Sequence, residues 1–355
     1  MMHIRAMRGE GIRMELVKGD YNHQLGICIP TYNRASKLRQ ALDTWIPIIA
    51  KYDIPIFISD NASSDDTENV VVERRKEYPH IFYCKNEENI GPDKNFEKVL
   101  KFADTKYRWL MGDDDVIVRG EISEILRHVE EDHDLLLVNY PLYRPYTVDV
   151  KYTDMNALLS DFGAMLTCMS AFVFHEKVVC SDTFTEAYNS DFSRINFAHL
   201  GATFCCLGDG HEHSVYFISS VGIDTIRVGL YSWLPLAMQY FINNLSATVS
   251  LLPGLYAESS RKKCCRDVLN VCWGWKGTRF YVYHAKKGKQ LSVRWYFRSR
   301  KNLKVVFDFR QRTLIFFTAL LPRFLVSVVW TMGSKINKQR RLRRERRAQT
   351  KMKGA

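Results

Sequence analysis

The chain has 355 residues, 46% of them hydrophobic, which is enough for one large domain or two ordinary ones with a sizeable core. Its net charge of +12 is unevenly divided: residues 1–260 carry 24 Lys and Arg against 36 Asp and Glu, whereas residues 261–355 carry 27 against 3. An acidic body joined to a basic end indicates that this end meets an anionic surface, either membrane or nucleic acid. Nine cysteines without a CxxC pair, and an N-terminus without an apolar stretch, argue against a secreted, disulfide-bonded protein and favour a cytosolic one.

Strands and helices are predicted to alternate along the first third of the chain. Residues 1–24 are polar and predict a poorly ordered lead-in. The predicted elements follow in this order: a strand at 25–29, a helix at 37–50 with Ser36 as N-cap, a strand at 54–59, a helix at 67–77, a strand at 81–86, a helix after Gly91, and a short strand at 109–111. This alternation predicts an α/β fold with a mostly parallel sheet flanked by helices.

Polar residues collect just beyond the predicted strands, where open α/β sheets bind their ligands. They are Thr31 to Arg34, Asp60 and Asn61, Asn89 to Asn95, and Asp113 to Asp115. Two or three carboxylates at the open end of a buried strand can hold Mg²⁺ or Mn²⁺ and leave coordination positions for phosphate oxygens. A solvated acidic turn is the alternative interpretation of the three aspartates.

Four motifs, in their order and spacing, resemble the family 2 inverting glycosyltransferases of the GT-A fold: ICIPTYNR, ISDNASSDDT, NIGPDKNF and WLMGDDDVI. Within that family, the abequosyltransferase-like group of bacterial surface-polysaccharide enzymes is most similar. The resemblance implies a Rossmann-like GT-A domain at 25–228, with a donor half at 25–118 and an acceptor half at 119–228. It also implies a nucleotide-sugar donor, a divalent cation, and transfer of a hexosyl or deoxyhexosyl group with inversion.

The resemblance places the donor at these motifs. The position of Asp60 implies a contact with the donor base or ribose, because a carboxylate accepts from N–H and O–H groups; a turn or capping aspartate is the alternative. Arg34 can pair with a diphosphate or form a surface ion pair. Asp113 and Asp115 are assigned to the metal in a DxD-type motif, and Asp114 to the sugar or ribose. The other expected donor-binding residues are Pro30, Thr31 and Tyr32 at the base pocket and Asn89, Gly91 and Asn95 at the nucleotide loop.

An inverting transfer also needs a general base for the acceptor hydroxyl. The broad family provides it in a Glu-Asp pair after the metal motif, and no such pair occurs in the expected region of this chain. Further strands are predicted at 135–140 and 165–177, on the acceptor side. The polar stretch that follows offers Asp191 and His199. His199 matches the "HL" of the abequosyltransferase-like group and has a suitable unperturbed pKa, but it can equally be a core histidine.

The composition changes beyond the glycosyltransferase-like part. Residues 229–312 predict broken helices and a basic, aromatic-rich extension. The apolar run that follows contains Pro322 and Arg323, which disfavour a single spanning helix. For 313–355 we predict two short amphipathic helices in the membrane interface and a polybasic tail, or alternatively a buried helix with a solvated tail. We therefore expect a cytoplasmic protein that is peripheral on the inner face of the plasma membrane.

Two classes of function compete. The first is a membrane-associated glycosyltransferase that acts on a glycan or a polyprenyl-linked glycan acceptor. The second is a nucleic-acid-binding protein that uses the basic C-terminal third. The aspartate cluster favours the first class, because a nucleic-acid binder has no need of it, so nucleic acid is not an expected partner. An inactive scaffold of the same fold is a further alternative, since the Glu-Asp pair is missing.

Overall fold

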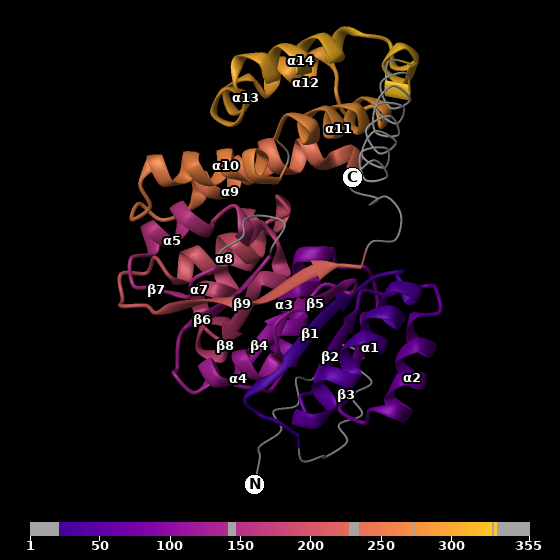
Figure 1. Cartoon of the computed structure of the whole chain (residues 1–355), viewed down its shortest axis with the longest axis vertical. Coiled ribbons are helices and arrows are strands. Elements are labelled where there is room, and N and C mark those ends of the chain that lie inside the picture. Colours follow the sequence, from indigo (N-terminus) through magenta and orange to yellow (C-terminus); the bar gives the residue numbers. More distant parts are fainter. Residues whose placement is uncertain (1–20, 141–146, 227–233, 273, 329, 332–355) are drawn as a thin grey trace, which may run out of the picture. The chain divides into compact units, whose positions relative to one another are not determined.

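The structure is a computed structural model that describes residues 21–140, 147–226, 234–272, 274–328, 330 and 331 (Figure 1). The chain forms two compact units. The first consists of Met1–Val228 and Ala247–Cys264, and the second of Gly229–Ser246 and Cys265–Ala355. The division falls inside two helices, α9 (Leu245–Leu251) and α10 (Glu258–Cys272).

The first unit contains all the strands of the described residues. They are β1 (Leu25–Thr31), β2 (Ile56–Asp60), β3 (Ile81–Lys85), β4 (Tyr107–Leu110), β5 (Asp115–Arg119), β6 (Leu135–Asn139), β7 (Val150–Tyr152), β8 (Phe172–His175) and β9 (Val215–Thr225). The helices are α1 (Ala35–Ile49), α2 (Thr67–Glu77), α3 (Pro92–Phe102), α4 (Ile122–Val129), α5 (Met155–Phe162), α6 (Glu176–Val179), α7 (Asp182–Asn189) and α8 (Ala198–Cys206). Short 3₁₀ turns lie at Ala50–Tyr52, Met165–Thr167, Met169–Ala171 and Asp191–Arg194.

The strands form one mixed sheet in the order β3-β2-β1-β4-β8-β6-β9-β5, with β7 paired to β9. Strands β1 to β4 are mutually parallel, and β6 is parallel to β9. Strand β8 is antiparallel to β4 and β6, and β5 and β7 are antiparallel to β9. The register places Thr31 beside Asp60 at the carboxyl edge of β1 and β2, which is the edge where parallel strands present their ligand-binding loops.

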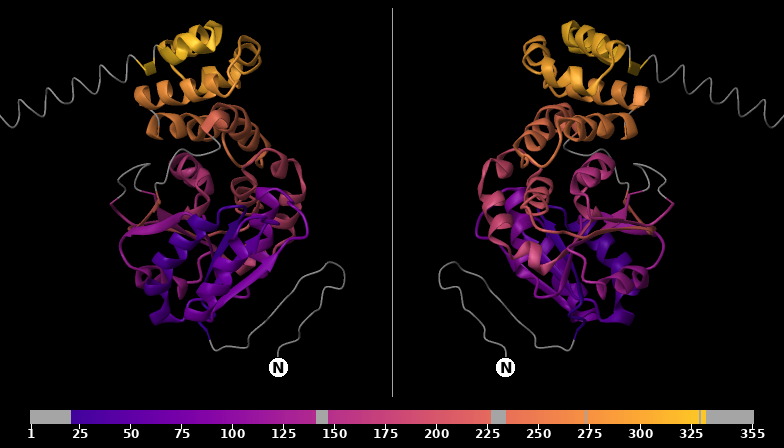
Figure 2. Two further views of the ribbon diagram at one scale, coloured as in Figure 1. Left: turned by 90° about the vertical axis from the view of Figure 1, so that its right-hand side faces the viewer. Right: turned by 90° about the vertical axis from the view of Figure 1, so that its left-hand side faces the viewer.

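Helices cover both faces of this sheet (Figures 1 and 2). On one face, Ile27 and Ile29 of β1 belong to a single apolar cluster with the buried sides of α1, α2 and α4. On the other face, the ring of Phe57 lies 5.6 Å from that of Phe102 in α3, edge to face. A strand covered on both faces reads as a continuous apolar run, which is why the sequence pattern of β1 is not alternating.

Most of the elements predicted in the donor half are present. Helix α2 has the predicted bounds, and the strand predicted at 81–86 is one residue shorter. Strand β1 continues through Pro30 instead of ending at residue 29. The N-cap predicted at Ser36 is wrong: α1 begins at Ala35, whose backbone N–H donates to Asp65 Oδ2 at 2.9 Å.

The acceptor half departs further from the predictions. The single strand predicted at 165–177 is wrong in its first half, since Met165–Thr167 and Met169–Ala171 are 3₁₀ turns and only Phe172–His175 is a strand. The prediction of a mostly parallel sheet holds for β1 to β4, whereas half of the strand pairs of the sheet are antiparallel. An apolar run shows that a segment is buried, but it does not show its direction or its backbone conformation.

The second unit is helical in its described residues. Besides a π-helical turn at Gln239–Asn244, it contains α11 (Gly274–Lys287), α12 (Val293–Arg298), α13 (Arg300–Val306) and α14 (Phe309–Leu320). The predicted break at Pro322 is confirmed, because α14 ends before it and residues 323–328 form a separate helical segment. In the part of the chain that the structure describes, no helix has the length and apolar character needed to cross a membrane. Residues 1–20 of the lead-in predicted at 1–24, and residues 332–355, which include the predicted polybasic tail, lie outside the described residues.

Candidate functional site

The three aspartates Asp113–Asp115 lie between β4 and β5, beside the first turn of α1. Arg34 reaches two of them: its Nη1 lies 2.7 Å from Asp113 Oδ1, and its Nη2 contacts Asp114 Oδ2. Lys37 Nζ lies 2.7 Å from the same oxygen of Asp114. Thr31, the last residue of β1, donates its hydroxyl to Asp113 Oδ2 at 2.7 Å. Two cations therefore cover two of the three carboxylates.

Asp115 is held by a different set of partners. Ser170 donates its hydroxyl to Asp115 Oδ2, and Thr225 donates to Oδ1 at 2.7 Å. Trp45 Nε1 donates to the backbone carbonyl of Asp115 at 3.0 Å. Gly112 provides the necessary space, because a Cβ atom at that position would lie 2.7 Å from Asp115 Oδ2. Two residues from distant parts of the chain thus hold the carboxylate of Asp115, and a third, Trp45, holds its backbone carbonyl.

Burial makes it energetically unfavourable for these three carboxyl groups to be ionised. Asp113, Asp114 and Asp115 are only 3%, 6% and 6% exposed. Burial raises the pKa of Asp113 to about 7, although the charge of Arg34 and the hydrogen bond from Thr31 oppose the shift. Burial also raises the pKa of Asp115 against the effect of its two hydroxyl partners. Such a cluster favours the arrival of further positive charge.

Asp60 is a fully buried anchor for the loop after β2. Its Oδ1 accepts from the Ser63 backbone N–H at 2.8 Å, and its Oδ2 accepts from the Tyr83 hydroxyl at 2.7 Å. Within this loop Ala62 has a φ of +63°, a left-handed conformation that is unusual for a residue other than glycine. Asn33, in the loop after β1, donates its backbone N–H to Ser63 Oγ at 2.8 Å. The loops after β1 and β2 are thereby tied together at the place where the resemblance puts the donor base or ribose.

Asn61 organises the loop that contains Asn89 and Gly91. Its Nδ2 donates to Asn89 Oδ1 at 2.8 Å and to the Gly91 carbonyl at 3.2 Å. Gly91 has a φ of +86°, the kind of backbone angle expected from the sequence. Asn95 lies behind this loop and is buried, with its side chain hydrogen-bonded to the hydroxyl and the carbonyl of Ser59. It supports the loop from inside the protein.

Sequence reasoning missed three residues that hold the aspartates. Ser170 and Thr225 lie 55 and 110 residues from Asp115, so no local pattern could point to them. Lys37 follows Arg34 by three residues, the spacing of neighbours on a helix, and this spacing is a signal that the sequence did contain.

The other predicted residues of the base pocket flank Thr31. Pro30 is buried within β1, and Tyr32, immediately beyond the strand, is exposed. Tyr32 is therefore a large aromatic ring that is open to solvent beside the carboxyl edge of the sheet.

His199 and Asp191, the candidates for the general base, have very different surroundings. His199 in α8 is 3% exposed, and burial lowers its pKa to about 4. Three aromatic rings surround it: Phe96, Phe172 and Phe197. Asp191 is exposed in a 3₁₀ turn and lies 3.7 Å from Arg194. The surroundings of His199 are those of a core histidine, and its catalytic role stays a prediction.

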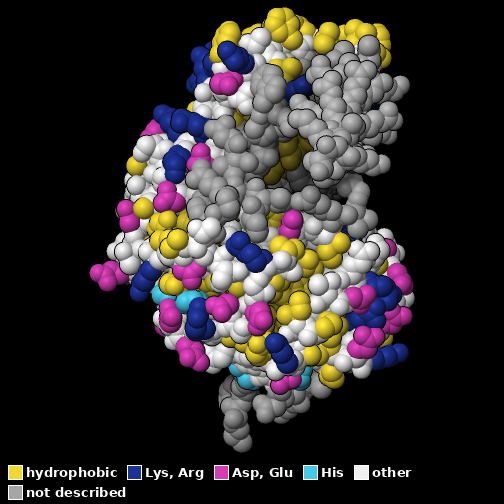
Figure 3. Space-filling view, viewed as in Figure 1, with side chains coloured by type: hydrophobic (Ala, Val, Ile, Leu, Met, Phe, Trp, Pro, Cys, Tyr) yellow, Lys and Arg dark blue, Asp and Glu magenta, His cyan; other side chains and the backbone are white. Residues whose placement is uncertain are grey.

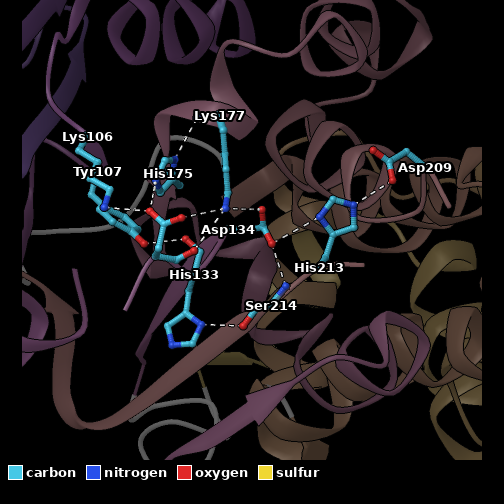
Figure 4. Close-up of polar contacts among 10 residues, drawn as sticks. Lys106, Tyr107, His133, Asp134, His175, Lys177, Asp209, His213 and Ser214 are labelled. Atoms are coloured by element: carbon cyan, nitrogen blue, oxygen red, sulfur yellow. Dashed lines mark hydrogen bonds and ion pairs between the residues drawn. The ribbon is translucent and has the colours of Figure 1, made fainter. Parts of the chain in front are cut away.

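A second polar cluster lies at the opposite edge of the sheet, where β4, β6 and β9 begin and β8 ends (Figure 4). Asp132 Oδ1 lies 2.8 Å from Lys106 Nζ and 3.0 Å from His175 Nε2, so it links the starts of β4 and β6 to the end of β8. Asp134 accepts from the Ser214 backbone N–H at 2.8 Å and links β6 to β9. These contacts join the ends of neighbouring strands.

The aspartate cluster fits a divalent cation that shares its coordination with phosphate. Mg²⁺ is usually held by one or two carboxylates together with substrate phosphates and water. Asp113 and Asp115 provide carboxylates of this kind, whereas among the described residues no group of three or more His, Cys, Asp or Glu side chains could hold a metal ion.

A mixed sheet covered by helices, with carboxylates and two cations at the ends of its parallel strands, defines an α/β domain of GT-A-like fold. Residues 26–184 match the model of the family described as Glycosyl transferase family 2, and this segment is a family 2 glycosyltransferase domain.

Two curated relatives are similar over part of the chain. Abequosyltransferase RfbV of Salmonella typhimurium is 36% identical over 116 residues, which cover 32% of this chain and 34% of the relative. GalNAc(5)-diNAcBac-PP-undecaprenol beta-1,3-glucosyltransferase of Campylobacter jejuni is 31% identical over 111 residues, or 31% of this chain and 36% of the relative. The chain thus spans about a third of the length of these relatives. The structure of S. aureus TarS 1–349 in complex with UDP-GlcNAc is similar in fold, with a TM-score of 0.55 at 14% identity over 87% of this chain and 92% of that one.

Proposed function

We propose that the chain is an inverting glycosyltransferase that moves a hexosyl or deoxyhexosyl group from a nucleotide-sugar donor to a glycan or polyprenyl-linked glycan in surface-polysaccharide biosynthesis. The observation that carries the proposal is the cluster of three buried aspartates under Arg34 and Lys37, at the carboxyl edge of a family 2 glycosyltransferase domain. The relatives support it by name, one as an abequosyltransferase and the other as a glucosyltransferase of a PP-undecaprenol compound.

We assign the donor diphosphate to Arg34 and Lys37. A guanidinium can pair with two phosphate oxygens at once, and a lysine adds a compact charge beside it. Both side chains are partly exposed, whereas the carboxylates beneath them are buried. They are therefore the first charged groups that an incoming diphosphate meets.

We assign the nucleoside to the loops after β1, β2 and β3. Asp60 acts on the base or ribose as a hydrogen-bond acceptor, and because its carboxylate is fully buried by Ser63 and Tyr83, these loops have to rearrange for the contact. Backbone groups from Pro30 to Tyr32 and the loop at Asn89 and Gly91 line the same side. Asn95 contributes by holding that loop.

We propose that Asp113 and Asp115 bind Mg²⁺ or Mn²⁺ and that Asp114 faces the sugar or ribose. When bound, the cation neutralises the charge of the departing nucleoside diphosphate. For this to happen, Arg34 has to release Asp113 Oδ1, which it contacts at 2.7 Å. The diphosphate offers Arg34 a replacement partner of the same sign.

The acceptor hydroxyl must also lose its proton, and His199 and Asp191 are the two candidates for accepting it. A histidine with a pKa of about 4 is neutral near pH 7 and able to take a proton, but only weakly. Asp191 has the opposite character, because it is exposed. If His199 is the base, His199→Ala lowers turnover and leaves donor affinity unchanged; if Asp191→Ala does this instead, His199 belongs to the core.

We further propose a cytoplasmic, peripheral location on the inner face of the plasma membrane, with residues 313–355 docking there. The excess of Lys and Arg in residues 261–355 supports an anionic partner. Nucleic acid is the competing anionic partner for this segment, and the carboxylate cluster is what disfavours it.

A thermal-shift screen tests the proposed function. UDP-, GDP-, CDP- and TDP-sugars are added with and without Mn²⁺, and one nucleotide class should raise the Tm only when the metal is present. Asp115→Asn should abolish this shift, whereas Glu73→Gln, which changes an exposed carboxylate on α2, should keep it. A chain that responds to none of the donors, or equally in both variants, does not have the proposed activity.

A further inference from the structure

The second unit exposes an unusual amount of apolar surface in one short segment. Half of the large, exposed hydrophobic side chains of the described residues lie between 297 and 328. Phe309, Phe324 and Phe317 are 74%, 67% and 59% exposed. Figure 3 shows hydrophobic side chains along the edge where α12 to α14 lie. Exposed apolar patches of this kind mark interaction sites.

Helix α14 is amphipathic, but its larger apolar side chains face outward. Residues 309, 316, 317 and 320 share one side of the helix by their spacing. The opposite, buried side consists of Gln311, Ile315, Thr318 and Ala319. A helix of a soluble protein normally buries its phenylalanines and exposes its glutamine and threonine, so this arrangement is inverted.

Polar bonds on the buried side fix this orientation. Gln311 Nε2 donates to Thr278 Oγ1 of α11 at 3.0 Å. Lys286 Nζ, also from α11, donates to the Ala319 carbonyl at 2.6 Å. Rotation of α14 to bury its phenylalanines would leave these buried groups without partners, which is costly. These bonds therefore hold the apolar side of α14 outward in the folded unit.

Basic residues are frequent in the segment that forms this apolar face. Between residues 293 and 331 there are eight Lys and Arg and a single acidic residue, Asp308. The carboxylate of Asp308 is engaged in capping α14, where it accepts from the Gln311 backbone N–H at 2.7 Å. Helix α12 extends the face, because the ring of Phe297 lies 6.1 Å from that of Phe316 in α14. This segment thus combines exposed apolar side chains with a strong excess of positive charge.

We propose that the outward face of α12, α14 and residues 323–328 docks on an anionic lipid bilayer, with α14 lying in the plane of the interface. A 12-residue helix is about 18 Å long, too short for a hydrocarbon core of about 30 Å. In the interface, the phenylalanines enter the acyl boundary while Lys and Arg remain among the headgroups. A second copy of the same face is a poor partner, since it would bring two segments of high positive charge together.

This inference deepens the proposed membrane location, and its test requires neither donor nor acceptor. Full-length protein is sedimented with phosphatidylcholine vesicles that contain or lack phosphatidylglycerol, at low and high salt. The wild-type chain should bind the anionic vesicles, and part of this binding should survive high salt, because apolar insertion is not screened. Replacing Phe309, Phe317 and Phe324 by serine should lower the salt-resistant binding by about tenfold or more.

Two control variants sharpen the test. Val72→Ser with Val118→Ser removes exposed apolar residues from the first unit and should leave vesicle binding unchanged. Arg298→Gln with Arg300→Gln and Lys301→Gln should lower binding at low salt and spare the salt-resistant part. If the triple variant fails to fold, Phe309→Ser alone replaces it in the test, because Phe309 is the most exposed of the three phenylalanines.

Three outcomes would overturn the inference. The phenylalanine variant could keep the salt-resistant binding of the wild type, or the wild type could ignore anionic vesicles and bind duplex DNA instead. Light scattering could also show a dimer that the phenylalanine variant dissociates, in which case the face binds a second copy of this chain. Donor-induced thermal shifts measured on the same preparations separate failure of the membrane face from failure of the glycosyltransferase proposal.

Discussion

Arg34 forms an ion pair with Asp113 above the carboxylate cluster, with Arg34 Nη1 2.7 Å from Asp113 Oδ1 and side chains that are 37% and 4% exposed. The guanidinium therefore occupies an oxygen that the proposed metal requires. A metal ion that binds alone has to compete with the Arg34 guanidinium for Asp113. When the diphosphate binds as well, it becomes a new partner for the guanidinium. Metal and donor should consequently bind with positive coupling.

Replacing Arg34 by glutamine tests this coupling. Mn²⁺ alone should bind more tightly to the variant, and a nucleoside diphosphate more weakly, each by up to about fivefold, since a partly exposed charge contact is worth up to about 1 kcal/mol. Calorimetry with Mn²⁺, the nucleotide and both together measures the two changes. Arg39→Gln, which breaks an exposed ion pair with Glu73, is the matched control. Unchanged Mn²⁺ affinity in Arg34→Gln would show that the ion pair between Arg34 and Asp113 does not compete with metal binding.

Asp115→Asn should separate metal binding from folding. Asparagine keeps an oxygen for one of the two hydroxyls, from Ser170 and Thr225, but it loses the negative charge. We expect loss of Mn²⁺ binding and of transfer with a modest change in Tm. Asp115→Ala should in addition cost about 1–3 kcal/mol of stability, because it leaves the buried hydroxyl of Ser170 and the partly buried hydroxyl of Thr225 without this acceptor. Full activity of either variant in excess EDTA would contradict the assigned role.

Tyr83→Phe tests Asp60 without removing its carboxylate. The hydroxyl of Tyr83 donates to Asp60 Oδ2 at 2.7 Å, so its loss frees the carboxylate to reorient. Asp60→Ala should weaken donor binding by about 1–3 kcal/mol, and Tyr83→Phe should weaken it by less. Calorimetry with the donor measures both. Tyr152→Phe, which breaks a tyrosine–aspartate bond far from these loops, should have no effect; equal donor affinity in all variants removes Asp60 from the site.

Asp93 and His199 should act on stability in opposite directions as the pH changes. Asp93 accepts from the Ala198 backbone N–H at 3.2 Å, and burial raises its pKa from 3.8 to about 7. Over that range the folded state holds a proton that the unfolded chain releases, so this contribution to the free energy of unfolding falls as the pH rises. Burial lowers the pKa of His199 from 6.5 to about 4, so its contribution rises with pH over nearly the same range.

In the wild type, the opposite pH dependences that Asp93 and His199 give to the free energy of unfolding should therefore largely cancel. Replacing either residue alone should reveal the pH dependence caused by the other. Asp93→Asn should be more stable at pH 7 than at pH 5, relative to the wild type, and His199→Asn should show the reverse. Each slope should reach at most about 1.4 kcal/mol per pH unit. Urea unfolding at several pH values measures them, with Glu77→Gln on the exposed side of α2 as control. Two variants with parallel pH curves would falsify this assignment.

The sequence was informative about the donor half and much less about the acceptor half. Residues near β1, β2 and β4 were found because a parallel strand and its polar loop are adjacent in the chain, so that each motif carries its own position. Ser170 and Thr225 reach Asp115 because β8 runs antiparallel to β4 and β9 runs antiparallel to β5, and strand direction leaves no trace in a short apolar run. The outward orientation of the apolar side of α14 could not be predicted for another reason. An apolar stretch predicts burial, but it does not tell whether the partner is a protein core or lipid.

Trp45 provides the protein with an internal fluorescent reporter. Its indole is fully buried, packs edge to face against Trp109 at 5.3 Å between ring centroids, and donates to the Asp115 carbonyl at 3.0 Å. A shift of the Asp115 peptide on ligand binding changes the polarity around this indole and with it the wavelength of its emission. Occupancy of the cluster can therefore be followed in unlabelled protein, and the part of the fluorescence change that disappears in Trp45→Phe belongs to this indole among the seven tryptophans of the chain.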